Sequence, residues 1–397
     1  MPAVRTPITD LLAALAPARD RLAAMDDAIV ATQVAITQVA APTGHEARRA
    51  AWISERFRAL GLVNVHQDAA GNVIARRPGR AELPPVVICS HLDTVFPAGT
   101  DLTVRRDGAR LVAPGITDNS RGLAVLLAIG EVLDGRTLLT ERPVEFVATV
   151  GEEGAGDLRG AKHYFAGEGR GAAAAIALDG AGDERIIHRA LGARRVRVDI
   201  RGPGGHSWAA FGAPNAIHAA GFVVSRLAAI RLPAEPRATL SVGRIGGGLS
   251  INAIPEHAWL EVDTRSVNAA ELDRIARELR AAVTTAIAEE NGRRARHTAP
   301  LTCEVTSIGD RPCGQTPADH PLVGAAHAVT QALGIAPELA TASTDANVPI
   351  GLGIPAIAIG AGGAGSDAHT TNEWYENTQG PRGVARALAI VVAAAGA

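Results

Sequence analysis

Two patterns of hydrophobic residues divide the chain into regions of different predicted structure. In the first, short aliphatic runs without polar alternation lie between segments whose apolar residues recur with helical spacing. Such runs are typical of parallel strands that are buried on both faces. Runs of this kind lie at 86–88, 143–150, 173–178 and 354–359, and 63–66 and 72–76 look like a strand pair that leads into the run at 86–88. Helices are predicted at 8–40, 46–60, 123–133 and from about 383.

The second pattern begins near residue 193, where RRVRVDIR at 194–201 alternates polar and apolar residues. Strict alternation is typical of an antiparallel strand with one exposed face. Further strands are predicted at 240–245 and 259–265, and helices at 214–230 and 269–290. We therefore predict an α/β domain, formed by 1–192 and 309–397, that is split by an inserted α+β domain at 193–308.

Composition narrows the classes of protein to which the chain can belong. A length of 397 residues with 47% hydrophobic residues is enough for two domains with large cores. The chain has 39 Lys and Arg residues against 41 Asp and Glu residues and no basic run, so we expect no nucleic acid partner. Lys162 is the only lysine, which disfavours Schiff-base chemistry.

The sequence also bears on the cellular setting. Acids and arginines at 10–21 interrupt the N-terminal apolar positions, so we interpret this segment as an amphipathic helix and not as a signal peptide. No apolar run reaches the roughly 18 residues that a membrane span needs. Cys89, Cys303 and Cys313 are too scattered for a disulfide framework. We therefore expect a cytoplasmic protein without a membrane partner.

Acids and histidines gather where the predicted strands end. His91 and Asp93 follow one buried strand, Glu152 and Glu153 follow the next, and Asp179 follows a third. The carboxyl ends of parallel strands meet at one edge of a sheet, where open α/β proteins bind their ligands. Histidine and carboxylate side chains bind metals, and adjacent carboxylates repel unless a cation or a proton separates them. The pattern therefore favours a metal site.

These residues leave three alternatives open. Asp118 stands at a loop-to-helix junction and can serve as the N-cap of the following helix. Cys89 shares strand parity with His91, which allows a cysteine hydrolase, although such a residue is more often a small buried hydrophobe. The third alternative is a non-catalytic binding protein.

Eight short motifs and the loop around Asp118 carry a resemblance that covers nearly the whole chain. The motifs are SHLDTV, GEEG, LDG, GPGGHSW, INAIP, EVDTRS, STDAN and AHTTNEW. In this order and at these separations they resemble the M20 family of zinc-dependent metallopeptidases. The similarity is greatest to its peptidase T-like members, near the glutamate carboxypeptidase and acetylornithine deacetylase branches. The resemblance implies a zinc-peptidase-like three-layer catalytic domain with a mostly parallel central sheet, split by an inserted ferredoxin-like domain for lid closure and dimerisation.

The resemblance further implies a site for two divalent metal ions, with zinc expected and manganese or cobalt as alternatives. One ion would be held by His91 and Asp179, and the other by Glu153 and His369. Asp118 would bridge both ions. The chemistry agrees, because carboxylates and imidazoles suit zinc and one carboxylate can be shared between two ions.

Other roles also come from the resemblance. It implies that Asp93 orients His91, that Glu152 is the general base, and that the peptide bond from Asp118 to Asn119 is cis. From the lid, His206 would stabilise the oxyanion, in the active site of the partner subunit of a homodimer.

Substrate contacts are expected from three further residues. Arg265 and Asn252 match family positions that reach a substrate carboxylate, which a planar guanidinium binds well. Asn347 lies where some deacylase members carry a carboxylate-clamping arginine, which disfavours a succinyl-diaminopimelate-type substrate. Aspartate at position 179 is typical of peptidase T-like and dipeptidase members. We therefore expect hydrolysis of short peptides, with hydrolysis of N-acyl amino acids as the alternative.

Overall fold

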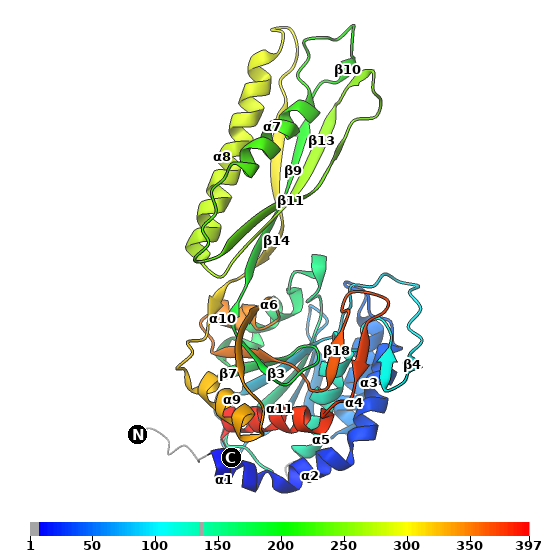
Figure 1. The fold of residues 1–397 in the computed structure, drawn as a ribbon, viewed down its shortest axis with the longest axis vertical. Coiled ribbons are helices and arrows are strands. Elements are labelled where there is room, and N and C mark those ends of the chain that lie inside the picture. The colour runs from blue at the N-terminus through cyan, green and yellow to red at the C-terminus, as the bar shows by residue number, and fades with distance from the viewer. Residues whose placement is uncertain (1–7, 135–137, 397) are drawn as a thin grey trace. The chain divides into compact units, whose positions relative to one another are not determined.

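The structure is a computed structural model and describes residues 8–134 and 138–396 (Figure 1). The chain forms two compact units, one composed of the residues up to Ala190 and from Gln315 onward, and the other of Leu191–Gly314. The boundary predicted after residue 308 falls inside strand β14 (Thr302–Arg311), so the smaller unit extends further along the sequence.

A mixed sheet forms the centre of the larger unit. The strands are ordered β1-β2-β6-β3-β7-β17-β8-β15, and β16 pairs with β8. The inner pairs β6-β3, β3-β7 and β7-β17 are parallel, whereas β1-β2, β2-β6 and β17-β8 are antiparallel. The strands are β1 Val63–Gln67, β2 Val73–Arg77, β3 Val86–His91, β6 Val144–Thr149, β7 Ala174–Leu178, β8 Arg185–Ala190, β15 Gly314–Gln315, β16 Glu338–Ala342 and β17 Ala356–Ile359.

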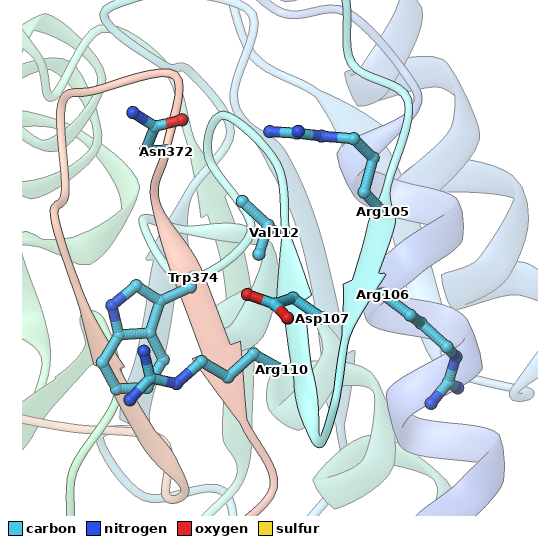
Figure 2. Close-up of a pocket in the computed structure, with 7 residues that line it drawn as sticks. All are labelled: Arg105, Arg106, Asp107, Arg110, Val112, Asn372 and Trp374. Carbon is cyan, nitrogen blue, oxygen red and sulfur yellow. The ribbon is translucent and has the colours of Figure 1, made fainter.

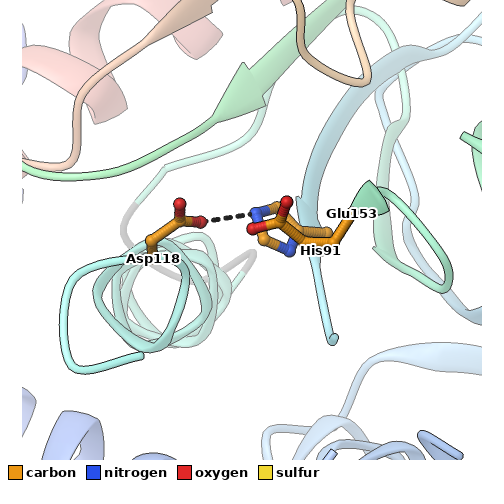
Figure 3. A group of neighbouring side chains, drawn as sticks. All are labelled: His91, Asp118 and Glu153. Atoms are coloured by element: carbon orange, nitrogen blue, oxygen red, sulfur yellow. Dashed lines mark ion pairs between the residues drawn. The ribbon is translucent and has the colours of Figure 1, made fainter. Parts of the chain in front are cut away.

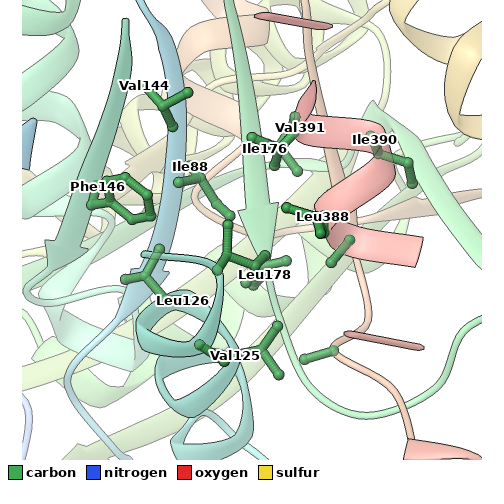
Figure 4. Close-up of a cluster of buried hydrophobic side chains, with 14 of the residues drawn as sticks. Ile88, Val125, Leu126, Val144, Phe146, Ile176, Leu178, Leu388, Ile390 and Val391 are labelled. Carbon is green, nitrogen blue, oxygen red and sulfur yellow. The ribbon is translucent and has the colours of Figure 1, made fainter. Parts of the chain in front are cut away.

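Helices cover both faces of this sheet, because neighbouring residues of a central strand enter opposite cores. Ile88 of β3 lies in a core with Leu126 and Leu388, which belong to helices α5 and α11 (Figure 4). Val87 lies in the other core, with Tyr164 of α6. The helices of this unit are α1 Ile8–Ala14, α2 Ala16–Ala24, α3 Asp26–Thr37, α4 Ala47–Ala59, α5 Ser120–Val132, α6 Arg159–Ala166, α9 Pro321–Ala332, α10 Asn347–Gly351 and α11 Gly380–Ala395.

The single helix predicted over 8–40 is wrong, because this segment forms the three helices α1, α2 and α3. Pro17 lies in the first turn of α2, where its missing N–H leaves no intrahelical bond unmade. Asp26 and Asp27 lie in the first turn of α3, where their charge favours a helix start. The apolar spacing continues across both breaks, so periodicity alone does not reveal them.

A small antiparallel sheet, ordered β18-β19-β5-β4, lies beside α3 in the same unit. Its strands are β4 Arg105–Asp107, β5 Arg110–Val112, β18 Ala364–Ser366 and β19 Trp374–Glu376. Leu111 and Tyr375 point from one face into a core that Val30 and Val34 of α3 complete. Residues of the opposite strand parity therefore face away from this core.

The smaller unit is ferredoxin-like, as predicted. Its sheet has the order β11-β13-β9-β14 with all pairs antiparallel, and helices α7 and α8 pack against it (Figure 1). The chain order of two β-α-β halves gives the ferredoxin-like topology. The elements are β9 Gly192–Arg201, β10 Gly205–His206, α7 Ala216–Ala228, β11 Ala238–Gly247, β12 Ala253–Ile254, β13 His257–Ser266, α8 Ala269–Arg293 and β14.

Among the described residues, no helix has the length and apolar character that a membrane crossing needs.

Together, the mixed sheet with helices on both faces and the inserted antiparallel unit confirm the predicted fold class. The sheet is less parallel than predicted, since the β1-β2-β6 edge runs antiparallel.

Candidate metal centre

The predicted metal ligands of the larger unit come from the ends of its central strands. His91 ends β3, Asp179 directly follows β7, and Glu153 follows β6 by four residues. Since β6, β3 and β7 are parallel neighbours, their carboxyl ends lie at one edge of the sheet. Asp118 precedes α5, and His369 lies in the connection from β18 to β19.

Asp118 stands between two imidazoles. Its Oδ1 lies 2.9 Å from Nε2 of His91, and its Oδ2 lies 3.2 Å from Nε2 of His369. The same nitrogen of His369 lies 2.9 Å from Oε1 of Glu153. Ligand atoms of His91, Asp118 and Glu153 all lie within 4.8 Å of one another, as Figure 3 illustrates. The carboxylate of Asp118 thus faces a different histidine with each oxygen.

The donor atoms around Asp118 fit a bound cation. Nδ1 of His91 lies 3.1 Å from the backbone carbonyl oxygen of Asp93, which can only accept, so this nitrogen carries the proton. When the imidazole is neutral, as a metal ligand must be, Nε2 directs a lone pair toward Oδ1 of Asp118, which is buried and has no hydrogen-bond partner among the described residues. Two ligand atoms about 2.0–2.2 Å from one ion in tetrahedral geometry lie roughly 3.4 Å apart, so a small outward shift of Nε2 and Oδ1 from their 2.9 Å separation would admit an ion.

The charges of the site support the same interpretation. Burial and the nearby charge of Asp118 raise the pKa of Asp179 to about 7 and also raise the pKa of Glu153. The contact with Asp118 raises the pKa of His369 to about 9. Burial opposes a charge on His91, but its contacts with Asp118 and Asp93 prevail and raise its pKa. The site therefore holds more negative charge than its burial tolerates, and a divalent cation would compensate it.

Asp93 holds the backbone that carries the adjacent glutamates. Its Oδ1 accepts the backbone N–H of Glu152 at 2.9 Å, and its Oδ2 accepts that of Glu153 at 3.0 Å. Thr43 donates its hydroxyl to the same carboxylate at 2.9 Å. The carboxylate lies 3.7 Å from Nδ1 of His91, so the hydrogen bond that orients His91 comes from the backbone carbonyl of Asp93. Burial raises the pKa of Asp93, but the contacts with His91 and these N–H groups outweigh it and lower the pKa to about 2.

The peptide bond from Asp118 to Asn119 is cis, as the resemblance implies. The N-cap of α5 is Asn119 and not Asp118, because the Asn119 side chain accepts the N–H of Gly122 at 3.1 Å. Nδ2 of Asn119 donates to the carbonyl of Leu178 at 2.8 Å, next to Asp179. Asn119 therefore ties the Asp118 loop to the end of β7.

The sequence interpretation missed Glu373, whose buried carboxylate accepts N–H groups from the loop that leads to Asp118. Glu373 stands in the motif AHTTNEW, four residues after His369. The only signal in the sequence is an acid close to a ligand histidine. An acid at that position is common in exposed loops, so the sequence alone gives no reason to single it out.

The remaining candidates are divided between the units. His206, Asn252 and Arg265 belong to the smaller unit, where His206 and Asn252 lie side by side because the N–H of Ser207 donates to the carbonyl of Asn252. Nε of Arg265 donates to Asp263 at 2.8 Å. Asn347 is buried in the larger unit, and its side-chain oxygen accepts the N–H of Thr344 at 3.0 Å. The Asn347 oxygen is thus engaged within the protein.

A cavity of about 430 Å³ lies on the exposed face of the small sheet (Figure 2). Asn372 and Trp374, which flank Glu373, line it together with arginines of β4 and β5. The guanidinium of Arg110 lies 3.8 Å from the centre of the Trp374 ring and 3.6 Å from Glu376. The segment that carries His369 therefore also borders an arginine-rich depression.

Cys89 does not fit the cysteine hydrolase alternative. Its side chain is buried in the core between the sheet and α6. Burial, with the nearby charges of Asp345 and Asp179, raises the pKa of the thiol well above its usual value. A thiol held in its protonated form is a poor nucleophile.

Comparisons with known proteins agree with this geometry. The model of the peptidase family M20/M25/M40 matches residues 87–393. Succinyl-diaminopimelate desuccinylase of Corynebacterium glutamicum is 28% identical over 248 residues, which are 61% of this chain and 66% of that protein. The match thus spans slightly less than two thirds of the length of that relative.

Solved structures resemble the chain over almost its whole length. Aminopeptidase PepT from Bacillus cereus is 25% identical, with a TM-score of 0.74 over 92% of this chain and 98% of that chain. The YXEP protein of Bacillus subtilis, a dinuclear metal-binding peptidase, is 18% identical, with a TM-score of 0.67 over 93% of this chain and 98% of that chain. The likeness to YXEP concerns the fold alone.

Proposed function

The chain belongs to peptidase family M20/M25/M40 and is a metallohydrolase, and we propose that it cleaves short peptides next to their free N-terminus. The observation that carries the metal chemistry of this proposal is the position of Asp118, with one oxygen 2.9 Å from His91 and the other 3.2 Å from His369. A carboxylate that faces two different imidazoles is arranged to bridge two cations.

In this proposal five side chains hold two divalent ions. His91 and Asp179 would bind one ion, Glu153 and His369 the other, and Asp118 both. Two ions bound there would lower the pKa of a water molecule and polarise the carbonyl of the scissile bond. Zinc suits this mixture of imidazole and carboxylate, and manganese or cobalt are the alternatives.

Glu152 is the residue that we assign to proton transfer. The carboxylate of its neighbour Glu153 contacts Nε2 of His369. The backbone N–H of Glu152 donates to Asp93, and the Glu152 side chain is mostly buried. Glu152 would take the proton of the attacking water and deliver it to the leaving amine. Asp93 accepts the backbone N–H groups of both glutamates and so fixes the position of the base Glu152 relative to the ligand Glu153.

We assign the oxyanion contact to His206 of a partner subunit, in a homodimer formed through the smaller unit. Two large apolar side chains follow His206 closely in the chain, and both, Trp208 and Phe211, are 87% exposed. Leu249 and Ile251, in the chain next to Asn252, are fully exposed. Apolar surface of this kind is typical of a protein contact, which supports a partner subunit at this end of the unit.

The substrate class follows from the residues that would meet the ends of a peptide. Arg265, with a side chain that is 40% exposed, would bind a distal carboxylate. It lies near the end of β13, whereas Asn252 precedes the start of that strand, so we assign Arg265 and Asn252 to separate substrate contacts. Asn347 in place of a clamping arginine and aspartate at 179 favour a free-amine peptide. The likeness to an aminopeptidase over 92% of the chain supports this choice.

Hydrolysis of N-acyl amino acids is the second candidate, because the relative from Corynebacterium glutamicum is a desuccinylase. A comparison of kcat/KM distinguishes the peptidase from the amidohydrolase activity. The substrates are di- and tripeptides with a free amine and the same peptides after N-acetylation or N-succinylation, each assayed with zinc, manganese and cobalt. We expect the free-amine series to be preferred. A tenfold preference for the blocked series, about 1.4 kcal/mol in transition-state binding, would assign the chain to the amidohydrolases.

A further inference from the structure

We propose that Glu373 is a positioning residue that fixes the backbone of the bridging Asp118 and thereby sets the affinity for the second metal ion. The inference rests on the dinuclear site proposed above. It concerns a residue that would not itself bind a metal, because its carboxylate is occupied by hydrogen bonds from the protein.

The carboxylate of Glu373 receives donors from one short loop. Oε2 accepts the N–H of Gly115 at 2.9 Å, and Oε1 accepts the N–H groups of Thr117 at 2.7 Å and Asp118 at 2.9 Å. The hydroxyl of Thr117 also donates to Oε1. Four donors within four consecutive positions thus converge on one side chain, and the last of them is the backbone of Asp118 itself.

Burying the Glu373 carboxylate costs free energy that an apolar side chain of similar size at this position would not cost. Glu373 is fully buried, and no basic side chain among the described residues forms an ion pair with it. A buried carboxylate without a cation is stabilised only by its hydrogen bonds, and bonds to a charged acceptor are shorter and stronger than neutral ones. A charged acceptor is therefore suited to hold a loop that must not shift.

The backbone of Glu373 extends the small sheet to the same loop. Trp374 pairs with Val112, and the N–H of Ala113 donates to the carbonyl of Glu373 at 2.9 Å. The backbone hydrogen bonds between β5 and β19 end there. Beyond that point the side chain of Glu373 accepts the N–H groups of the residues that follow β5. The Asp118 loop is thus a continuation of β5 that a side chain supports.

Glu373 also links the two ligands that face each other. His369 precedes it by four residues, in a segment closed by the N–H of Glu373 donating to the carbonyl of Thr370 at 3.2 Å. The backbone of His369 has a φ of 66°, a left-handed conformation that favours glycine and needs support from its surroundings. The segment 369–373 therefore sets the position of Asp118 relative to His369.

The test is Glu373→Gln, which keeps the size of the side chain. Oε1 and Oε2 both accept N–H groups, so the amide NH₂ of glutamine must face at least one donor and push the loop away. The matched control is Glu376→Gln in β19, the strand that begins directly after Glu373, where the carboxylate is partly exposed and lies 3.6 Å from Arg110. Metal-free protein is titrated with zinc by calorimetry, and steady-state kinetics follow at saturating metal.

We expect Glu373→Gln to bind the weaker zinc ion at least tenfold less tightly than wild type, with kcat reduced and KM within about threefold. Glu376→Gln should match wild type in zinc affinity, kcat and KM. Equal zinc affinity in wild type and Glu373→Gln would overturn the proposal. If that variant does not fold, Thr117→Val removes only the hydroxyl donor, and wild-type zinc affinity in this variant would count against the proposal. Wild type that binds fewer than two zinc ions would instead overturn the dinuclear site.

Discussion

Nε2 of His369 lies 2.9 Å from Oε1 of Glu153, although 216 positions separate the two residues in the sequence. The contact joins the connection after β18 to the end of β6, and Asp118 approaches the same nitrogen at 3.2 Å. One metal ion at this position could thus bind Nε2 of His369 together with an oxygen from each of the two carboxylates, and Asp118 would bridge it to a second ion.

The first prediction concerns metal content. We expect close to two divalent ions per chain in the active protein, reversible loss of activity on chelation, and at most one ion in Asp118→Asn. Elemental analysis of dialysed protein measures this. Because the Cys89 thiol is buried, a thiol reagent should leave activity intact. Full turnover by metal-free protein would contradict the proposed site.

The second prediction separates the general base from the ligands. Glu152→Gln should retain both metal ions and lose a factor of about 10² to 10⁴ in kcat, because it removes proton transfer and leaves the ligand atoms in place. Glu153→Gln, by contrast, should also lose metal. Steady-state kinetics with elemental analysis compare the two variants, and wild-type kcat in Glu152→Gln would assign the base to another residue.

The third prediction tests whether His206 serves the partner subunit. Mixing inactive His206→Ala with inactive Glu152→Gln should restore about a quarter of wild-type activity, because random exchange makes half of the dimers mixed, each with one complete site. Native mass spectrometry verifies the exchange. Each variant mixed with itself is the control, and an inactive mixture of verified heterodimers would show that each chain supplies its own histidine.

The fourth prediction concerns the pH dependence of stability in the smaller unit. Hydrogen bonds from Arg197 and His257 outweigh the smaller effect of burial and lower the pKa of Asp199. A lowered pKa means that Asp199 stabilises the fold above its unfolded pKa of about 3.9, and that this contribution is lost as pH falls through the folded value. Asp199→Asn should therefore cost about 1 kcal/mol of unfolding free energy at pH 7 and progressively less below pH 4.

Urea denaturation of wild type and Asp199→Asn at pH 7 and pH 3 measures the difference. Asp20→Asn, at an exposed position of α2, is the control and should match wild type at both values. A cost that is the same at both pH values would mean that Asp199 acts through packing and not through its charge.

Local patterns were enough for much of the fold and for the identity of the metal-binding side chains. The apolar runs at 143–150 and 173–178 became β6 and β7, and the alternating segment at 194–201 became most of β9. These signals are local, because a strand must match the polarity of its two faces residue by residue. The residue types at the strand ends likewise limit the chemistry, since only a few side chains bind metals.

Tertiary structure alone decided which atoms meet. The sequence contains Glu373 as one acid among 41 acidic residues, and its function as a hydrogen-bond acceptor for the Asp118 loop depends on the pairing of β19 with β5. In the same way, the resemblance implies that Asp93 orients His91, but only the packed chain shows that the Asp93 carboxylate accepts the N–H groups of Glu152 and Glu153. Hydrogen bonds between distant segments depend on angles and distances that only the packed chain defines, so spacing in the sequence does not encode them.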